Sequence, residues 1–402
     1  MTTQKATQAP GSLDPSFGEE GNAFYFPPVT VPTLRLLSTS RLRTDGKIFS
    51  AGYYHNRGDL VLVRFLSNGR LDDSFGEGGV KVVSVVSGYR IVRCVLELAS
   101  DDSAFISCSF GDIGAQTIFV CKVLPNGELD ASFGSRGIVF LDFSPGGDVA
   151  DELAIQADGK ILLSVSSYEK LLVRLDTRGD FDPSFGSGGI ARAKQVQNPS
   201  LIVLPDGRLL VAGSDNSTGS GTGVICFVRY LNNGAIDPDF GEDGTITIDL
   251  KNTQYAYVLS AVQQRDGKIV AVGAVIVEEK GYFTLVTRIN INGSLDSTFN
   301  NGVPILTGPP YYSRGEGVAI QPDNKILVGS YTGGAFHLMR YLSSGALDLT
   351  FGVQGKVMNK LTGGMDKADT IALQADGKIV QLGRVELDPD RGTGVGIARY
   401  FG

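Results

Sequence analysis

The chain has few of the residues that commonly carry catalytic chemistry. Its 402 residues include two histidines, His55 and His337, and four cysteines. It contains no nucleophile elbow, no glycine-rich phosphate loop and no pair of histidines at metal-ligand spacing. The sequence therefore predicts no catalytic residue, no metal ligand and no cofactor, and it favours a binding protein over an enzyme. We expect His337, inside an apolar run, to be a partly buried ring with its hydrogen bonds satisfied.

Three acidic clusters are the strongest candidates for a cation site. None has the loop spacing that calcium sites use, so we expect solvated loop charge at all three. They are Asp148 with Asp151 and Glu152, Glu278 with Glu279, and Asp388 with Asp390.

Long apolar runs and excess positive charge are also missing. No stretch approaches the roughly 18 apolar residues of a membrane span, and the first residues, MTTQKATQAPGS, are polar. We therefore expect no signal peptide and no membrane segment, with a cytoplasmic location or export by a signal-independent route. The net charge of -7 argues against a nucleic-acid partner, because phosphate binding needs a positive surface.

The four cysteines lie in apolar stretches and match no zinc motif. Cys94, Cys108 and Cys121 follow one another at spacings of 14 and 13 residues, and Cys226 stands apart. We expect all four to be buried free thiols that pack as small apolar groups. A cross-strand disulfide and a metal site remain the alternatives.

Glycine, by contrast, is abundant, and much of it falls in a repeated element. The chain has 53 glycines, and the stretch NGRLDDSFGEGG at 68–79 recurs as NGELDASFGSRG at 126–137. Seven copies can be aligned on one phenylalanine, at intervals of 52 to 59 residues. The aligned residues are Phe17, Phe75, Phe133, Phe185, Phe240, Phe299 and Phe351. Such a period indicates a repeat architecture rather than several unrelated domains.

Each repeat holds four short apolar, β-branched runs separated by turn residues. Asp158-Gly159 separates two of these runs and predicts a two-residue type I′ hairpin; five repeats carry Asp-Gly at this point. Four antiparallel strands per unit, seven times over, predict an all-β, seven-bladed β-propeller forming a single domain. The expected blades cover roughly 18–66, 76–124, 134–176, 186–231, 241–291, 300–342 and 352–402.

We expect the repeated element to carry the chain from the outer strand of one blade to the inner strand of the next. The copy at 9–21 would then close the ring against the C-terminal strand. Inner-strand residues Lys81, Asp142, Arg192, Lys194, Asp249 and Lys356 would line the central channel.

A cation precedes the aspartate of this element by eight positions in every repeat that precedes a copy. Arginine presents a fork that suits a carboxylate, so we expect seven structural ion pairs, with the repeated phenylalanine packed between blades. The pairs are Arg64 with Asp72, Lys122 with Asp130, Arg174 with Asp182, Arg229 with Asp237, Arg288 with Asp296, Arg340 with Asp348, and Arg399 with Asp14 across the closure.

The motifs LDxSFGxxG, QxDGKI and VRY or VRF resemble the delta-60 repeat family of bacterial proteins. They stand here at Leu71 to Gly79, Gln156 to Ile161 and Val63 to Phe65, among other copies, and span nearly the whole chain. The resemblance implies a propeller-type repeat architecture. It implies no reaction, because the family is defined by its repeat.

Function is expected in the loops that differ between repeats. Alternate loops of each antiparallel blade leave on the same face; one set is nearly uniform here and the other varies, and binding residues favour variable loops on rigid scaffolds. Aromatic rings with neighbouring cations make the candidate binding site, namely Tyr53, Tyr54, His55, Arg57, Tyr311, Tyr312, Arg314 and Tyr331.

The sequence thus predicts a non-enzymatic scaffold, favoured as a monomer, that binds a protein or glycan partner. The alternative is a propeller hydrolase or lyase with an acidic or metal-dependent site at the central channel. A lectin with one identical sugar pocket per blade is disfavoured, because the variable loops differ from blade to blade.

Overall fold

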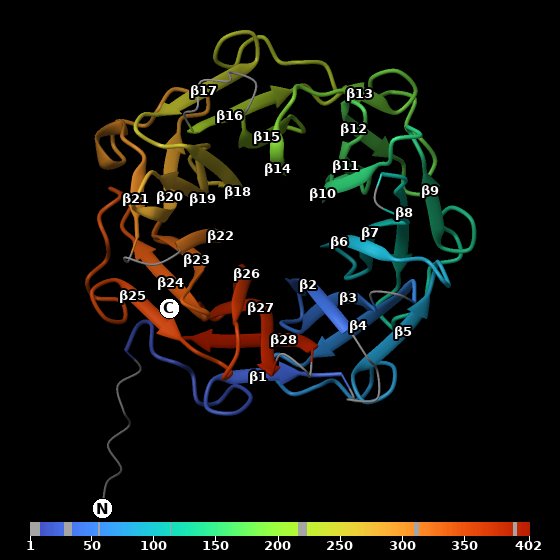
Figure 1. Ribbon diagram of the computed structural model, residues 1–402, viewed down its shortest axis with the longest axis horizontal. Coiled ribbons are helices and arrows are strands. Elements are labelled where there is room, and N and C mark those ends of the chain that lie inside the picture. The colour runs from blue at the N-terminus through green and yellow to red at the C-terminus, as the bar shows by residue number, and fades with distance from the viewer. Residues whose placement is uncertain are drawn as a thin grey trace, which may run out of the picture.

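Seven four-stranded antiparallel sheets surround a central axis in the computed structural model (Figure 1). The structure describes residues 9–27, 34–54, 57–112, 114–215, 223–308, 313–388 and 392–402. The first strand of each sheet lies nearest the axis and the fourth lies at the rim. This confirms the predicted all-β, seven-bladed propeller with four antiparallel strands per blade.

The blades follow one another in chain order, and the last takes its rim strand from the N-terminus. Blades one to three are β2–β5 (Leu34–Leu42, Ile48–Tyr54, Asp59–Phe65, Val80–Ser84), β6–β9 (Ile91–Leu98, Ala104–Phe110, Thr117–Val123, Ile138–Leu141) and β10–β13 (Val149–Ile155, Ile161–Ser166, Lys170–Leu175, Ile190–Arg192). Blades four and five are β14–β17 (Gln197–Val203, Leu209–Ser214, Gly223–Tyr230, Thr245–Leu250) and β18–β21 (Tyr255–Gln263, Ile269–Val277, Gly281–Ile289, Ile305–Thr307). Blade six is β22–β25 (Ser313–Ile320, Ile326–Thr332, Ala335–Tyr341, Lys356–Asn359), and blade seven is β26–β28 (Lys367–Leu373, Ile379–Asp388, Gly392–Tyr400) with β1 (Asn22–Tyr25).

The repeated element does not join neighbouring blades, contrary to the expectation from the sequence. Residues 176–189, for example, connect β12 to β13, and these two strands pair within blade three. Every expected blade range, from 18–66 to 352–402, is therefore displaced by one strand. A repeating sequence sets the period, but any of four connections per period can separate one sheet from the next. Only strand pairing decides which connection does so.

The same displacement moves the residues expected in the channel to the outside of the wheel. Lys81, Arg192, Asp249 and Lys356 lie on the rim strands β5, β13, β17 and β25. Asp142 and Lys194 lie in connections between blades.

The two ends of the chain meet in blade seven, as predicted for residues 9–21. Leu13 bridges Tyr400, and β1 pairs with β28 from Asn22 opposite Ala398 to Tyr25 opposite Val395. Figure 1 shows β1 beside β28 at the lower edge of the wheel. Closure therefore takes both the repeated element and the strand that follows it.

The Asp-Gly hairpins differ in detail from the predicted type I′ turn. Gly159 has a φ of 82°, whereas Asp158 keeps a negative φ. The Gly159 amide donates to the Gln156 carbonyl oxygen, and the Lys160 amide donates to Asp158 Oδ1. This is the three-residue loop in which a turn is followed by one left-handed glycine.

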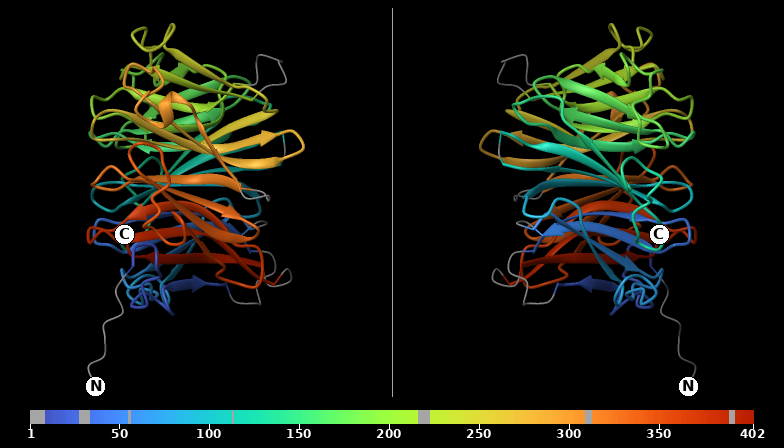
Figure 2. Two further views of the ribbon diagram at one scale, coloured as in Figure 1. Left: turned by 90° about the vertical axis from the view of Figure 1, so that its left-hand side faces the viewer. Right: turned by 90° about the vertical axis from the view of Figure 1, so that its right-hand side faces the viewer.

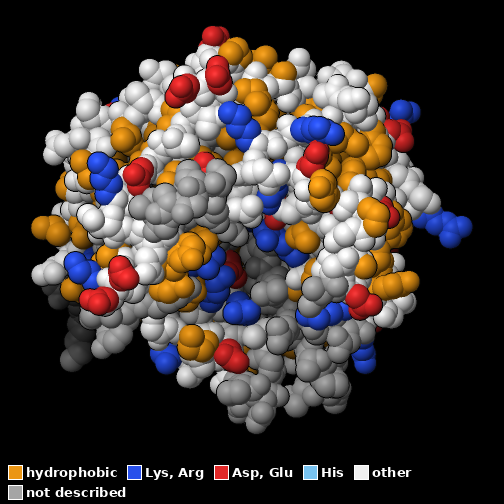
Figure 3. Space-filling view, turned by 45° about the horizontal axis from the view of Figure 1, so that its top comes forward, with side chains coloured by type: hydrophobic (Ala, Val, Ile, Leu, Met, Phe, Trp, Pro, Cys, Tyr) orange, Lys and Arg blue, Asp and Glu red, His pale blue; other side chains and the backbone are white. Residues whose placement is uncertain are grey.

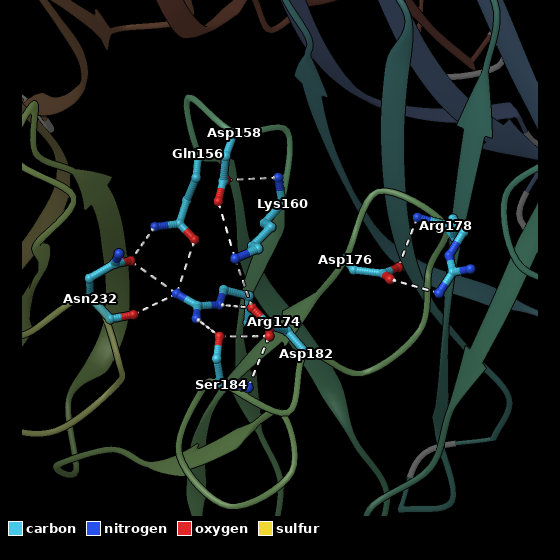
Figure 4. Close-up of polar contacts among 9 residues, drawn as sticks. All are labelled: Gln156, Asp158, Lys160, Arg174, Asp176, Arg178, Asp182, Ser184 and Asn232. Atoms are coloured by element: carbon cyan, nitrogen blue, oxygen red, sulfur yellow. Dashed lines mark hydrogen bonds and ion pairs between the residues drawn. The ribbon is translucent and has the colours of Figure 1, made fainter.

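All seven predicted ion pairs form, at N–O distances of 2.6 to 2.9 Å. Figure 4 shows the one in blade three. Arg174 Nε lies 2.7 Å from Asp182, one of its two amino groups donates to Ser184, and the other donates to the main-chain oxygen of Asn232. Asn232 belongs to the next blade, so one guanidinium joins strand, loop and neighbouring blade.

A second cation completes the network in six of the seven blades. Lys160, from the Asp-Gly hairpin, lies 3.2 Å from Asp182. Burial disfavours the charged form of Asp182, yet Ser184, Lys160 and Arg174 together hold its pKa below the usual range. An aspartate with a lowered pKa stabilises the fold only while ionised, so this contribution is lost as the pH falls below about 4.

The repeated phenylalanine fills the joint between neighbouring blades, as predicted. In six blades the arginine lies over this ring, 4.4 to 4.7 Å from its centroid. The ring edge also approaches the Asn-Gly turn of the next blade: a Cβ on Gly127 would lie 2.7 Å from Phe75. Gly127 has a φ of 91° as well, so the motif needs glycine there for two reasons.

The cysteines are only partly as expected. Cys94 and Cys108 face each other on β6 and β7 and form a disulfide, which corrects the prediction of four free thiols. Cys121 and Cys226 are buried free thiols, as predicted. Register explains the difference: a direct cross-strand pair brings two Cβ atoms to about 4.5–5.5 Å.

We predict that Arg174→Ala lowers the free energy of unfolding by about 3 kcal/mol or more, because it leaves buried Asp182 without its closest cation. Arg178→Ala is the matched control: Arg178 pairs with Asp176 and Asp180, but its side chain is 74% exposed. Its loss should cost less than about 0.5 kcal/mol. Urea titration of both variants checks this, and equal losses would contradict a special role for the network.

Blade two is the exception, since Lys122 replaces the arginine and bonds Asp130 alone. We predict that Lys122→Arg raises the free energy of unfolding by about 1 kcal/mol, because a guanidinium adds bonds to Ser132 and to the Thr177 carbonyl. Urea titration beside Lys122→Gln, which should destabilise, provides the measurement. No gain from arginine would show that the contact to the next blade contributes nothing.

Candidate binding face and central channel

The two faces of the wheel are built from different connections. Loops joining first to second and third to fourth strands leave on one face, here called the hairpin face, where the C-terminus also lies (Figure 2). Loops joining second to third strands and the connections between blades leave on the other, here called the loop face. The arginine networks occupy the hairpin face. The loop face carries the segments that vary, such as 167–169 in blade three and 278–280 in blade five.

The predicted aromatic residues of blade one are structural. Tyr53 is 1% exposed, and its hydroxyl donates to the Val92 carbonyl oxygen at 3.0 Å. Tyr54 is 8% exposed, with the guanidinium of exposed Arg57 5.9 Å from its ring centroid. These tyrosines thus anchor the loop instead of presenting contact surface. Three other predicted site residues, His55, Tyr311 and Tyr312, lie outside the described residues.

The remaining predicted residues come together at blade six. Arg314 and Tyr331 are cross-strand partners on β22 and β23. Arg314 Nε lies 2.9 Å from Glu316 Oε1, and the ammonium of Lys367, from blade seven, lies 5.7 Å from the Tyr331 ring centroid. The structure thus brings Arg314 and Tyr331 together in a charged cluster and leaves the blade-one residues apart from it.

Other aromatic side chains are exposed on the loop face. Tyr168 is 91% exposed in the turn between β11 and β12, and Tyr255 is 52% exposed at the start of β18. Tyr168 borders the loop-face end of a groove of about 890 Å³, which runs along the rim of blade three past Leu171 and Ile190 to residues 233–235 of the hairpin face. A lone aromatic residue inside a short turn was the available sequence signal for Tyr168.

A cavity of about 770 Å³ runs along the axis and is lined by the first strands of all seven blades. Each of these strands has a register shift in its pairing with the second strand, in the manner of a β-bulge. A bulge re-aims the side chains that follow it. The ring thus repeats one irregularity seven times around the channel.

The charged side chains of the channel are gathered on one arc. Blades six, seven, one, two and three contribute them, whereas blades four and five contribute Ser200, Ser260 and aliphatic groups such as Leu259 and Val262. Figure 3 shows Lys and Arg side chains gathered about the central hollow. The charged lining residues are Arg41, Arg93, Glu97, Glu152, Glu316, Lys367 and Asp369.

Most acidic groups of the arc are paired with a cation. Arg41 Nε lies 3.0 Å from Glu97, and Lys367 lies 3.5 Å from Glu316 and 3.0 Å from Asp369. Burial raises the pKa of Glu316, and the charges of Lys367 and Arg314 counter this rise. Glu97, Glu316 and Asp369 therefore each have a cationic partner in the channel wall.

Glu152 is different. Among the described residues, none lies within ion-pair distance of its carboxylate or donates a hydrogen bond to it. Desolvation raises its pKa to about 7; Arg93 and Arg41 oppose the rise, while Glu97 and Asp151 add to it. Glu152 is thus a channel-lining carboxyl that titrates near neutrality, a frequent property of functional sites.

The acidic cluster that contains Glu152 was expected to be solvated loop charge, and this was wrong. Asp148 is fully buried and accepts from the amides of Phe143 and Ser144. Asp151 is 7% exposed and lies 3.3 Å from the Lys170 ammonium. The two aspartates therefore hold the start of blade three, and Glu152 alone lines the channel.

His337 lies in strand β24, as predicted, but it is more deeply buried than expected, at 4% exposed, and does not line the channel. Its Nδ1 lies 3.0 Å from Ser330 Oγ, and desolvation lowers its pKa to about 4. The ring is therefore neutral at physiological pH. Among the described residues, no group of three or more His, Cys, Asp or Glu is placed to hold a metal ion. Within the same residues, no helix has the length and apolar character needed to cross a membrane.

Closed ring, repeated ion-pair network and bulged inner strands define a seven-bladed β-propeller of the repeat type. Five segments, 43–75, 156–185, 204–240, 264–299 and 321–351, match the family described as a domain of unknown function (DUF5122) beta-propeller. In these five segments the chain is therefore similar to the DUF5122 beta-propeller family. No curated protein sequence matches it.

Two solved structures of virginiamycin B lyase from Staphylococcus aureus resemble the whole wheel. One is 10% identical, with a TM-score of 0.53 over 94% of this chain and 98% of the other. The second, a catalytically inactive variant with quinupristin, is 11% identical, with the same TM-score over 94% and 99%. A protein of unknown function from Dyadobacter fermentans is 10% identical, with a TM-score of 0.46 over 95% and 98%. At these identities the likeness to the two lyase structures establishes the fold alone.

The position of Glu152 predicts that the free energy of unfolding depends on pH. Its folded-state pKa of about 7 lies above the ordinary 4.5. The free energy of unfolding therefore falls as the pH rises between these two values, because the unfolded chain ionises more readily than the folded one. We predict that Glu152→Gln is more stable than the wild type by about 1–3 kcal/mol at pH 8, and that this advantage disappears near pH 4.5. Urea titrations at both pH values check it.

Glu242→Gln, at an exposed position on the hairpin face, is the control and should leave the pH profile unchanged. An advantage of Glu152→Gln that is equal at both pH values would contradict the proposed desolvation.

Proposed function

We propose that this protein is a non-enzymatic binding scaffold that presents its loop face to a protein or glycan partner. The observation that carries the proposal is that one face of the wheel is nearly the same in every blade and the other is not. Side chains of the hairpin face are used in the repeated networks, whereas the loop face holds segments that differ in every blade. A rigid ring that holds unlike loops is suited to one asymmetric partner.

The groove beside Tyr168 supports this reading. An exposed tyrosine over an apolar groove, near the Arg192–Glu169 ion pair at 3.0 Å, has the composition of a contact patch. Tyrosine supplies a large contact area at small entropic cost, which is why it is enriched among residues that dominate binding.

Tyr168→Ser tests the face. We expect it to weaken binding of a ligand selected from a glycan array or a displayed peptide library at least tenfold, since exposed aromatic residues dominate such contacts. Leu349→Ser is the matched control, because Leu349 is 71% exposed on the hairpin face. Affinities are measured by calorimetry. Equal weakening by both variants, or no ligand from either library, would contradict the proposal.

A hydrolase or lyase with its site in the channel is the second candidate, and Glu152 favours it. A carboxyl that titrates near pH 7 can act as a general acid or base at physiological pH. Turnover of glycoside, ester or elimination substrates that Glu152→Gln abolishes would support this reading, and stoichiometric metal in the purified protein would support its metal-dependent form. Metal-free protein without turnover would exclude it.

A further inference from the structure

The channel offers a second kind of site, separate from the loop face. The cavity of about 770 Å³ lies within the range of pockets that hold small organic molecules. Its lining has two unlike walls, the charged arc and the neutral wall of Ser200, Ser260, Leu259 and Val262. A ligand that fits both walls has a charged side and a side that packs against hydroxyl and aliphatic groups.

Arg93 and Glu152 are the groups of the charged arc with capacity for a ligand. Arg93 is exposed in the channel wall and donates one hydrogen bond, to the main-chain oxygen of Asp151 at 2.7 Å. In the described part of the chain, no carboxylate lies within ion-pair distance of its guanidinium. A guanidinium has five N–H donors, so most of this capacity remains for another group.

The side chains around Arg93 and Glu152 limit the class of ligand that the channel can bind. Arg41 is paired with Glu97 at 3.0 Å, and Lys367 is shared by Glu316 and Asp369. Among the channel-lining side chains that the structure describes, the available cation is therefore Arg93, whose planar fork matches a carboxylate. The available acceptor is Glu152, which calls for a hydroxyl or ammonium donor near that carboxylate.

We propose that the channel binds a small carboxylic acid that carries a neighbouring hydroxyl or amino group. Its carboxylate pairs with Arg93, its donor bonds Glu152, and its carbon skeleton lies against the wall of blades four and five. Hydroxy acids, amino acids and uronic sugars share this chemistry. The proposal does not rest on a partner at the loop face, and either can fail without the other.

Calorimetry or ligand-detected NMR with four probes tests it: malate, serine, glucuronate and, as the neutral analogue, glucose. We expect at least one of the three acids to bind and glucose not to bind. Arg93→Gln and Glu152→Gln should each weaken that acid at least tenfold, whereas Arg93→Lys, which keeps the charge but not the fork, should weaken it less than Arg93→Gln. The acid that binds identifies the source.

Two controls keep the result interpretable. Arg178→Gln and Glu242→Gln make the same chemical changes at exposed positions of the hairpin face and should leave the affinity unchanged. Near-ultraviolet circular dichroism confirms that each variant is folded. Failure of all three acids to bind would overturn the proposal, as would an affinity that Arg93→Gln leaves unchanged. Weakening by Tyr168→Ser alone would place the site on the loop face instead.

Discussion

The wheel depends on one contact, a buried guanidinium shared by a strand, a loop and the next blade. A four-stranded sheet has two apolar faces and buries neither by itself, and each apolar cluster here lies between neighbours, as with Val95 of blade two and Leu153 of blade three. The arginine adds direction to this packing, because its fork fixes how far each blade is turned relative to the next. Seven nearly equal joints close a ring, and a single different joint is tolerated where Lys122 stands.

Concentrating the joints at one face leaves the rest of the molecule free to vary. The Gln, Asp-Gly-Lys, Arg, Asp, Ser and Phe of the motif converge on the hairpin face, as at Gln156, Lys160 and Arg174 (Figure 4). The loop face and the channel-lining residues of the first strands take no part in that network. A charged arc inside the ring and unlike loops above it can therefore change without loss of closure.

The sequence predicted those parts that recur at constant spacing. Arg174 and Asp182 are eight positions apart in a pattern that every blade shares, so their pairing followed from spacing and charge alone. The point in each repeat at which one blade ends and the next begins was not predicted. Hydrogen bonds between strands, not the repeat length, decide where one sheet ends. Because of that error the wrong residues were expected to line the channel. Arg41 and Glu152 lie on the true inner strands, whereas Lys81 lies at the rim.

The burial of Tyr53 and Tyr54 was not foreseen for a related reason. Alternation along an ordinary two-layer sheet exposes one of two neighbouring residues, but both faces of a propeller blade are covered. Tyr53 packs toward blade two and Tyr54 toward blade seven, so neither reaches the surface. Tyr168 is exposed because it lies in a turn beyond the end of the sheet.

Closure through β1 also sets an order of events during synthesis. Asn22 leaves the ribosome long before its partner Ala398 is made. Strand β1 therefore has no sheet to join while six blades assemble behind it, and its pairing with β28, at a long sequence separation, follows them. Until then the nascent chain is an open arc with an unpaired edge at blade seven, where a chaperone or a second nascent chain would compete with the chain's own N-terminus.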